Sequence, residues 1–181
     1  MLPVAPGCRQ VTLYNNASPA RALTIEAPLG VATAEGGLGL DPARRYHVYD
    51  FWNDRYVGRI AGSSRLRQTL RPGEARMLSF HAAVDHPQVV STNRHILQGA
   101  LDLIGEPVWD AARHALRGRS RVVAGEPYRL VIAANGHPLR SASCDRGAAA
   151  LRAAPGWTDL FECTIRPERS GIVAWTVSGT K

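Results

Sequence analysis

Cysteine and lysine are scarce in this sequence, and no long hydrophobic run occurs in it. Its three cysteines, Cys8, Cys144 and Cys163, are odd in number and form no CxxC motif, so neither a metal-ligand set nor a disulfide framework is predicted. We interpret them as small hydrophobic residues, with Cys163 inside a strand, although one disulfide among them stays open. Without about 20 consecutive apolar residues no segment can span a bilayer, which predicts a soluble protein without a membrane partner.

Other expected features are missing as well. The N-terminus lacks a basic segment followed by an apolar core, so no signal peptide is visible; a fragment of a longer chain would lack one in any case, and the compartment is not predicted. Long amphipathic helices and a convincing internal repeat are absent, which favours short strands.

The charge balance is basic, with 22 basic and 15 acidic residues and a formal net charge of +7. Such a balance raises the question of nucleic-acid binding. Lys181 is the only lysine, however, and the near-total use of arginine beside abundant alanine and glycine indicates a genome-composition effect. The arginines are also spread along the chain, apart from two groups, Arg65 with Arg67, and Arg117, Arg119 and Arg121. We therefore expect no nucleic-acid partner.

The most informative stretch runs from Arg45 to Gly58 and is rich in aromatic residues. Read with a period of two, Tyr46 and Val48 share one face while His47 and Tyr49 share the other. Bulky side chains on both faces predict a strand covered on both sides, followed by a turn at Asn53–Asp54 and a partner strand from Tyr56.

Short alternating segments surround this stretch and predict a first β-sandwich over residues 1–84. The expected strands are Arg9 to Tyr14, Arg21 to Glu26, the central strand and its partner, Leu66 to Leu70, and Ala75 to Ala82. Arg71-Pro-Gly-Glu74 is a strong turn signal. In residues 85–94, Asp85-His-Pro and Ser91-Thr-Asn flank a short Gln-Val-Val and interrupt the strand pattern, so this segment is predicted to be a linker.

A second β-sandwich is expected over residues 95–181, which predicts an all-β fold of two tandem antiparallel β-sandwich domains. Pro107 to Gly118 has helical spacing, but Asp110 can close a turn between strands, and we favour a hairpin. Ala148 to Ala154 fits either one helical turn or an edge strand. The remaining strands are expected at Ile96 to Leu103, Pro127 to Ala134, Trp157 to Ile165, and Gly171 to Val177.

Several motifs resemble the C-terminal β-sandwich of α-galactosidase-like (melibiase-type) glycoside hydrolases. They are His47-Val-Tyr-Asp-Phe-Trp-Asn-Asp-Arg-Tyr-Val-Gly58, Leu70-Arg-Pro-Gly73 and Met77-Leu-Ser79. The stretch from His86 to His95, with Gln98-Gly99, resembles the segment C-terminal to this sandwich in some bacterial members. The resemblance covers residues 40–135 and rests on framework motifs.

The resemblance implies a piece of a larger enzyme, or a relative of that piece, with a catalytic (α/β)8 barrel in a longer chain or a partner protein. Retaining glycosidases hold two carboxylates about 5 Å apart. A barrel of that kind takes about 250 residues of alternating strand and helix. This chain has neither the length nor the helices, so the family's catalytic pair is carried over onto no position here.

Asp50 and Asp54 are the carboxylates nearest to the aromatic residues of the central stretch. A buried carboxylate among rings can have a raised pKa and act as an acid. We favour structural roles instead, with Asp50 accepting hydrogen bonds inside the sandwich and Asp54 capping the turn. No second carboxylate is placed opposite by the sequence.

Aromatic side chains offer a second candidate site, a platform against which sugar rings pack. Its members would be Trp52, Tyr56, Tyr49, Trp109 and Trp157. Aromatic residues in strands usually belong to the core, and this is our expectation for Trp175 and Phe161. Trp52 and Tyr56 lie beside the predicted turn, where contact with a ligand or between domains stays open.

The histidines are scattered, and we expect neither a metal ion nor a cofactor. His86 and His95 flank the predicted linker, but their spacing supports neither metal ligation nor a nucleophilic Ser91–His95 pair. Arg94 and His95 are expected to hydrogen-bond the two sandwiches together.

The resemblance thus implies a non-catalytic accessory region that supports a catalytic barrel, with carbohydrate contact as an additional role. A stand-alone carbohydrate-binding module is the first alternative, and it would need at least two exposed coplanar rings. A small enzyme with an unrecognised site is the second, and it would need two titratable groups in one pocket.

Overall fold

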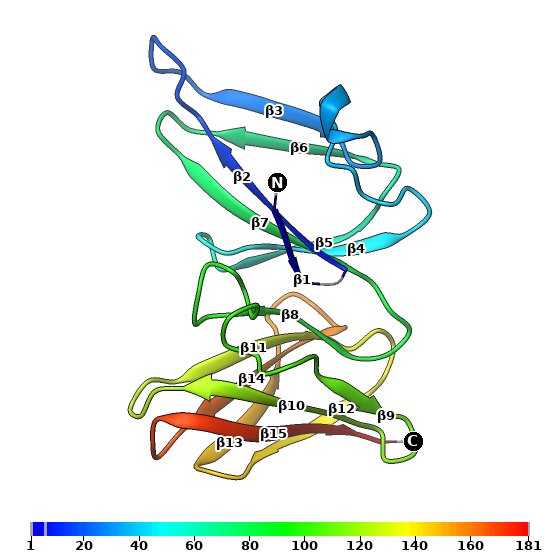
Figure 1. Ribbon diagram of the computed structural model, residues 1–181, viewed down its shortest axis with the longest axis vertical. Coiled ribbons are helices and arrows are strands. Elements are labelled where there is room, and N and C mark those ends of the chain that lie inside the picture. The colour runs from blue at the N-terminus through cyan, green and yellow to red at the C-terminus, as the bar shows by residue number, and fades with distance from the viewer. Residues whose placement is uncertain (1, 6, 181) are drawn as a thin grey trace. The chain divides into compact units, whose positions relative to one another are not determined.

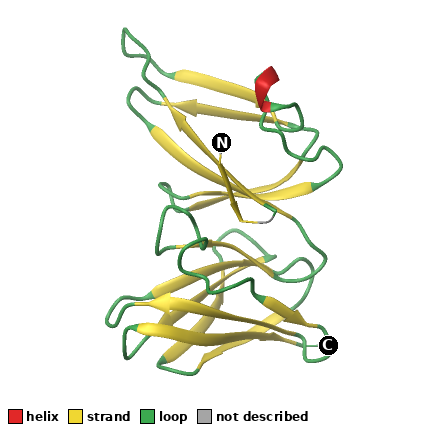
Figure 2. Ribbon diagram, viewed as in Figure 1, coloured by secondary structure: helices red, strands yellow, loops and turns green. Residues whose placement is uncertain are grey.

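Short alternating segments produce an almost purely β structure. The computed structural model describes residues 2–5 and 7–180, and strands make up 52% of it. Within these residues the only helical segment is the 3-10 turn η1 (Thr33–Glu35), drawn in red in Figure 2. All named strand pairs are antiparallel and form four sheets, which confirms the predicted fold class. The chain divides into two compact units, Met1–Ala83 and Val84–Lys181.

The first unit contains a five-stranded and a two-stranded sheet. Their orders are β1-β2-β7-β4-β5 and β3-β6 (Figure 1). The strands are β1 (Leu2–Ala5), β2 (Cys8–Tyr14), β3 (Leu23–Pro28), β4 (Arg45–Asp50), β5 (Arg55–Ala61), β6 (Arg65–Leu70) and β7 (Ala75–Ala82).

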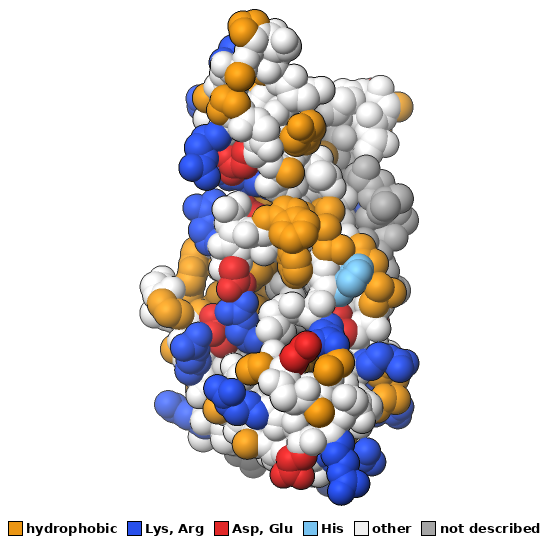
Figure 3. Space-filling model, turned by 90° about the vertical axis from the view of Figure 1, so that its left-hand side faces the viewer, with side chains coloured by type: hydrophobic (Ala, Val, Ile, Leu, Met, Phe, Trp, Pro, Cys, Tyr) orange, Lys and Arg blue, Asp and Glu red, His pale blue; other side chains and the backbone are white. Residues whose placement is uncertain are grey.

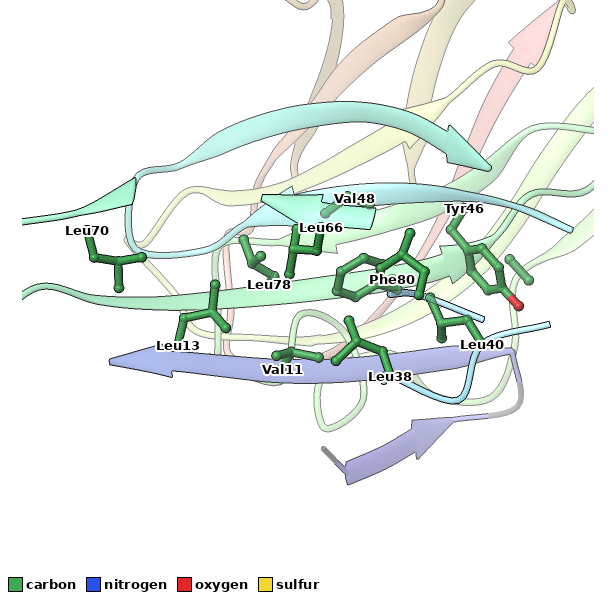
Figure 4. Packing of buried hydrophobic residues seen from close by; sticks show 12 residues of the cluster. Val11, Leu13, Leu38, Leu40, Tyr46, Val48, Leu66, Leu70, Leu78 and Phe80 are labelled. Carbon is green, nitrogen blue, oxygen red and sulfur yellow. The ribbon is translucent and has the colours of Figure 1, made fainter. Parts of the chain in front are cut away.

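One hydrophobic core joins these two sheets. Val11 and Leu13 of β2 and Phe80 of β7 pack with Leu66 and Leu70 of β6, which come from the other sheet (Figure 4). Loop residues 29–40 add three buried leucines to the same cluster. Because alternate residues of each strand point to the same face, each sheet supplies one apolar face and the core lies between them.

The central strand β4 lies between β7 and β5 and is covered on both faces, as its sequence predicts. Tyr46 and Val48 belong to the core, whereas His47 and Tyr49 are buried on the opposite face. The pairing of β4 with β5 shifts register between Val48 and Tyr49. Such a bulge changes the local twist immediately before the turn.

The second unit is built from two four-stranded sheets, ordered β12-β15-β10-β9 and β13-β14-β11-β8 (Figure 1). The strands are β8 (Gln88–Thr92), β9 (Val108–Asp110), β10 (Ala115–Val122), β11 (Tyr128–Ala133), β12 (Leu139–Cys144), β13 (Ala148–Ala153), β14 (Leu160–Arg166) and β15 (Gly171–Gly179).

Trp175 of β15 is the largest side chain in the core of the second unit and is only 2% exposed. Its ring lies over Gly118 on β10, its register partner, where an added Cβ would lie 2.2 Å from Cζ2 of the ring. The indole Nε1 donates a 2.9 Å hydrogen bond to Ser120 Oγ. A glycine at position 118 therefore makes room for the Trp175 ring. Phe161 is half-buried and packs against the same core.

The second unit departs from the sequence-based expectation at two segments. Residues 88–92, which fall within the predicted linker, form β8 and pair with β11. Ile96 to Leu103 is a series of turns rather than a strand, with a single bridge from Leu103 to Ser120. The reason is local: Gln98 and Gly99 adopt positive φ angles of 51° and 107°, which interrupt an extended chain.

Two other segments follow one of their alternatives. Val108–Asp110 and Ala115–Val122 pair as the favoured hairpin. Asp110 Oδ1 accepts the backbone N–H of Arg113 at 3.0 Å, which is the expected closure of the turn. Ala148–Ala153 is the edge strand β13 and not a helical turn.

Candidate functional site

The β4–β5 connection, residues 51–54, presents the most exposed tryptophan of the described chain, and we call it the aromatic turn. Phe51 N donates to the carbonyl oxygen of Met77 on β7 at 2.9 Å, and Asp54 N donates to the carbonyl oxygen of Phe51 at 3.2 Å. Asp54 has a φ of 46°, a conformation that aspartate tolerates better than most residues. These bonds tie the start of the turn to the neighbouring strand.

Two side chains at the end of β4 support the same turn. Asp50 is fully buried, and its Oδ2 accepts a 2.7 Å hydrogen bond from Asn53 Nδ2. Tyr49 Oη donates a 2.6 Å hydrogen bond to Asp54 Oδ1. Both carboxylates therefore act as acceptors that fix the turn, which are the structural roles favoured by the sequence.

Trp52 is 59% exposed and projects from this supported backbone. Its ring meets the ring of Phe51 edge to face, with centroids 5.2 Å apart and an interplanar angle of 73°. The next three side chains, Asn53, Asp54 and Arg55, are exposed and polar. An indole beside an amide, a carboxylate and a guanidinium offers an apolar surface with hydrogen-bonding groups at its edge, which suits a partly polar ligand.

Tyr49 and Tyr56, the other two candidates of the first unit, do not extend this surface. Tyr49 and Tyr56 are 4% and 9% exposed, and Tyr56 Oη lies 2.7 Å from Nδ1 of His47. Their rings offer no exposed face to a ligand, so they are not part of an exposed platform. Tyr49 belongs to β4, which is covered on both faces, and Tyr56 is its register partner on β5.

Trp109 and Trp157 belong to the second unit. Trp109 is half-buried, packs against the core, and meets the rings of His114 and His137 edge to face at 6.2 and 5.0 Å. Trp157 is 41% exposed and lies in the connection between β13 and β14. Of the two, Trp157 is the more exposed.

Two carboxylates approach one guanidinium near the aromatic turn. Arg76 Nε lies 2.9 Å from Glu74 Oε1 and 3.9 Å from Asp50 Oδ2. A backbone hydrogen bond from Arg71 and a side-chain hydrogen bond from Arg76 hold the pKa of Glu74 below its ordinary value. A general acid of a glycosidase needs a raised pKa, so the lowered pKa of Glu74 is the wrong one for that role.

A thiol and an imidazole also meet in the first unit, a contact that sequence reasoning missed. Cys8 Sγ lies 3.6 Å from His81 Nε2, across the pair formed by β2 and β7. Burial raises the pKa of Cys8 to about 12 and lowers the pKa of His81 to about 4, with His47 as a second, smaller cause for His81. Both groups are therefore neutral at pH 7, whereas a nucleophilic cysteine needs a thiolate.

The polar residues at the start of the second unit bond locally. Ser91 Oγ donates to Gln98 Oε1 at 3.1 Å, and His95 Nδ1 accepts the backbone N–H of Leu97 at 3.1 Å, so each member of the hypothetical Ser91–His95 pair bonds to another residue. Arg94 forms a close ion pair with Glu126. The expected role of Arg94 and His95 between the sandwiches stays a prediction.

A buried polar cluster in the second unit also escaped sequence reasoning. Tyr128 Oη donates a 2.6 Å hydrogen bond to Asp102 Oδ2, and both residues are at most 3% exposed. Burial first, and the charge of Asp102 second, raise the pKa of Tyr128 above its ordinary value. The available signal was a single aspartate inside the apolar segment from Ile96 to Ile104.

Residues 2–5 and 7–180 contain neither a metal-binding cluster nor a membrane-spanning helix. No three histidine, cysteine, aspartate or glutamate side chains there are arranged to hold a metal ion. In the same described residues, no helix has the length and apolar character to cross a membrane. No protein-family model matches the chain, and no curated protein matches it either.

Proposed function

We propose that this chain is a non-catalytic accessory β-sandwich region that contacts carbohydrate through the aromatic turn and supports a catalytic (α/β)8 barrel in a longer chain or a partner protein. The observation that carries the proposal is the 59% exposed Trp52 on a turn fixed by Asp50, Asp54 and Tyr49. An exposed indole on a mobile loop would lose conformational entropy on binding, whereas a prearranged ring avoids much of that cost.

The location of the turn supports the link with glycoside hydrolases. Residues 47–58, the longest of the motifs that resemble the α-galactosidase-like sandwich, form the end of β4, the aromatic turn and the start of β5. The motif therefore builds the exposed tryptophan and the buried residues that hold it. This overlap is what connects the family resemblance with carbohydrate contact.

The state of the reactive groups supports a non-catalytic role. The acids beside the aromatic turn share Arg76, and the pKa of Glu74 is lowered and not raised. The buried Cys8–His81 pair is neutral at pH 7. A stand-alone binding module has less support, because Phe51 stands nearly perpendicular to Trp52 and does not form a coplanar platform with it.

The proposal is tested by glycan binding of the purified chain and two variants. We expect binding to a neutral oligosaccharide in a glycan array, and a loss of about tenfold or more in Trp52→Ala, which corresponds to about 1.4 kcal/mol. Tyr14→Ala is the matched control because Tyr14 is an equally exposed aromatic residue, 56%, in the same unit. Its affinity should stay within about twofold of the unmodified chain.

Three results would contradict the proposal. Absence of binding to every neutral glycan, or equal losses in both variants, would remove the role of the aromatic turn. Turnover of chromogenic glycosides by the purified chain would show that the region is catalytic.

A further inference from the structure

Three arginines occupy successive outward positions of β10: Arg117, Arg119 and Arg121. Between them, Ser120 is fully buried and bonded to Trp175, so the intervening residues face the core. Because side chains alternate between the faces of a sheet, the three guanidinium groups share the outer face, with Cα atoms about 6.8 Å apart from one arginine to the next. We call these residues the arginine stripe.

The strand beside the stripe does not neutralise it. The register partners of the three arginines on β15 are Thr176, Ala174 and Ile172, none of which carries a charge. On the next strand, Ser143 of β12 lies opposite Thr176. Antiparallel sheets usually gain from opposite charges placed directly across strands, and this pairing is missing here.

Asp110 contacts one end of the stripe, and Asp145 lies beside Ala174, the register partner of Arg119; each of these acids also has a partner outside the stripe. Asp110 Oδ2 lies 2.9 Å from Arg113 and 3.8 Å from Arg117, and the hydrogen bonds from Arg113 lower the pKa of Asp110. Asp145 Oδ1 accepts the backbone N–H of Ala174 at 2.9 Å. Within the part of the chain that the structure describes, neither Arg119 nor Arg121 has a carboxylate oxygen within 4.0 Å.

We propose that the arginine stripe binds an anionic polysaccharide, an extended chain of sugars that carry carboxylate or sulfate groups. A guanidinium group donates paired hydrogen bonds to such planar or tetrahedral anions, and a row of three meets repeated anions along one chain. The neighbours on β15, Thr176, Ala174 and Ile172, add neither an acidic side chain that would compete for the guanidinium groups nor an aromatic ring. The stripe belongs to the second unit and the aromatic turn to the first, so this inference does not depend on the function proposed above.

The same face does not fit a single-stranded nucleic acid. Sites for single strands combine a basic surface with aromatic rings on which bases stack. The outward neighbours of the stripe on β15 are aliphatic or hydroxyl side chains, and Trp175 of that strand points into the core. The charge is therefore present without the stacking surface. On the face of the molecule drawn in Figure 3, basic and acidic side chains are interspersed.

The test compares two double variants of the full chain that remove the same charge. Arg119→Gln with Arg121→Gln alters the stripe. Arg65→Gln with Arg67→Gln is the control, because these exposed arginines of β6 are also two residues apart but lie 3.9 and 3.2 Å from Glu26. Binding to polygalacturonate, dextran sulfate, neutral dextran and a thymidine oligonucleotide is measured by affinity electrophoresis at several salt concentrations.

We expect the unmodified chain to bind polygalacturonate or dextran sulfate and to ignore neutral dextran. The stripe variant should bind the anionic polymer about tenfold more weakly. The slope of its log affinity against log salt concentration should be smaller in magnitude by about two. The control variant should stay within about twofold. The tighter of the two polymers identifies the preferred anion, and Trp52→Ala should leave this binding unchanged.

Equal losses in both double variants would overturn the inference, since they would show a general effect of net charge. Tighter binding to the oligonucleotide than to either polysaccharide at the same salt concentration would assign the stripe to nucleic acid instead. Retention of full affinity in the stripe variant would also contradict it. Thermal unfolding of both variants checks that each remains folded.

Discussion

The hydrogen bond between Tyr128 and Asp102 gives the sharpest prediction for the stability of the second unit. Tyr128 Oη donates at 2.6 Å to a carboxylate that is 3% exposed and lies in the turn-rich segment 96–104. The second oxygen, Asp102 Oδ1, has no hydrogen-bond partner within the described residues. Tyr128→Phe therefore removes the identified donor from a buried acid.

The magnitude comes from the chemistry of this bond. A hydrogen bond to a charged group contributes about 1.5–3 kcal/mol, and a carboxylate left buried without its donor adds a desolvation cost. We expect Tyr128→Phe to lower the free energy of unfolding of the second unit by about 2–3 kcal/mol. For a unit of this size the melting temperature should fall by about 10 °C or more.

Urea unfolding followed by the fluorescence of the buried Trp175 measures this change. Tyr14→Phe is the control, since it removes a hydroxyl from a 56% exposed side chain and should change stability by less than about 0.5 kcal/mol. In a double-mutant cycle with Asp102→Ala, the loss of stability in the double variant should be smaller than the sum of the two single losses by about 1 kcal/mol or more. Additive losses, or a change below about 0.5 kcal/mol in Tyr128→Phe, would refute the reasoning.

Three further predictions concern packing, pH and thiol reactivity. Gly118→Ala should destabilise the second unit by about 3 kcal/mol or more, because the new Cβ would lie 2.2 Å from the Trp175 ring; a loss under about 1 kcal/mol in urea unfolding would show that the ring moves freely. Burial lowers the pKa of His81 from 6.5 to about 4. As the pH drops, the unfolded chain therefore binds a proton at this histidine before the folded chain does. The free energy of unfolding should fall by up to about 3 kcal/mol between about pH 6.5 and pH 4. His81→Gln should flatten the difference between pH 7 and pH 5, and an unchanged profile would exclude this histidine as its source. With the native chain, a thiol reagent at pH 8 should modify Cys144 alone, because burial raises the pKa of each of the other two thiols to about 12; rapid modification of all three before unfolding would contradict that burial.

Local sequence patterns were sufficient to predict a strand or a hairpin where the pattern is clear. The central strand was predicted from bulky residues on both faces, and β4 is covered on both faces. The hairpin of β9 and β10 was favoured because Gly105 and Gly118 bound the segment and its neighbours are strands, and the carboxylate of Asp110 closes the turn. In each case the deciding interactions lie within a few residues of one another, so the sequence contains them directly.

The sequence-based prediction was wrong for two segments whose structure is not determined by their strand-like or linker-like pattern. β8 was predicted to be part of a linker because its short Gln-Val-Val segment becomes a strand only by pairing with β11, some forty residues later. The leucines of Ile96 to Leu103 imitate strand spacing, but the positive φ angles at Gln98 and Gly99 prevent an extended chain.

The candidate site was predicted only in part for a related reason. Alternation cannot tell which rings stay exposed when both faces of a strand are apolar, so Tyr49 and Tyr56 could not be separated from Trp52. Contacts such as Cys8 with His81 join residues 73 positions apart, and no local pattern records them. The position of a side chain at a turn was predictable, whereas its burial depended on the fold.

Carbohydrate contact by Trp52 is tested most directly by following the indole N–H signals in a nitrogen–proton NMR spectrum during titration with the oligosaccharide that binds in the glycan array. The chain has four tryptophans, and the spectrum of Trp52→Ala identifies the signal of Trp52 by its loss. We predict that this signal shifts progressively to saturation while the signal of the buried Trp175 stays in place. Saturable shifts of another indole signal with Trp52 unmoved, or binding without any indole shift, would contradict the proposed role of the aromatic turn.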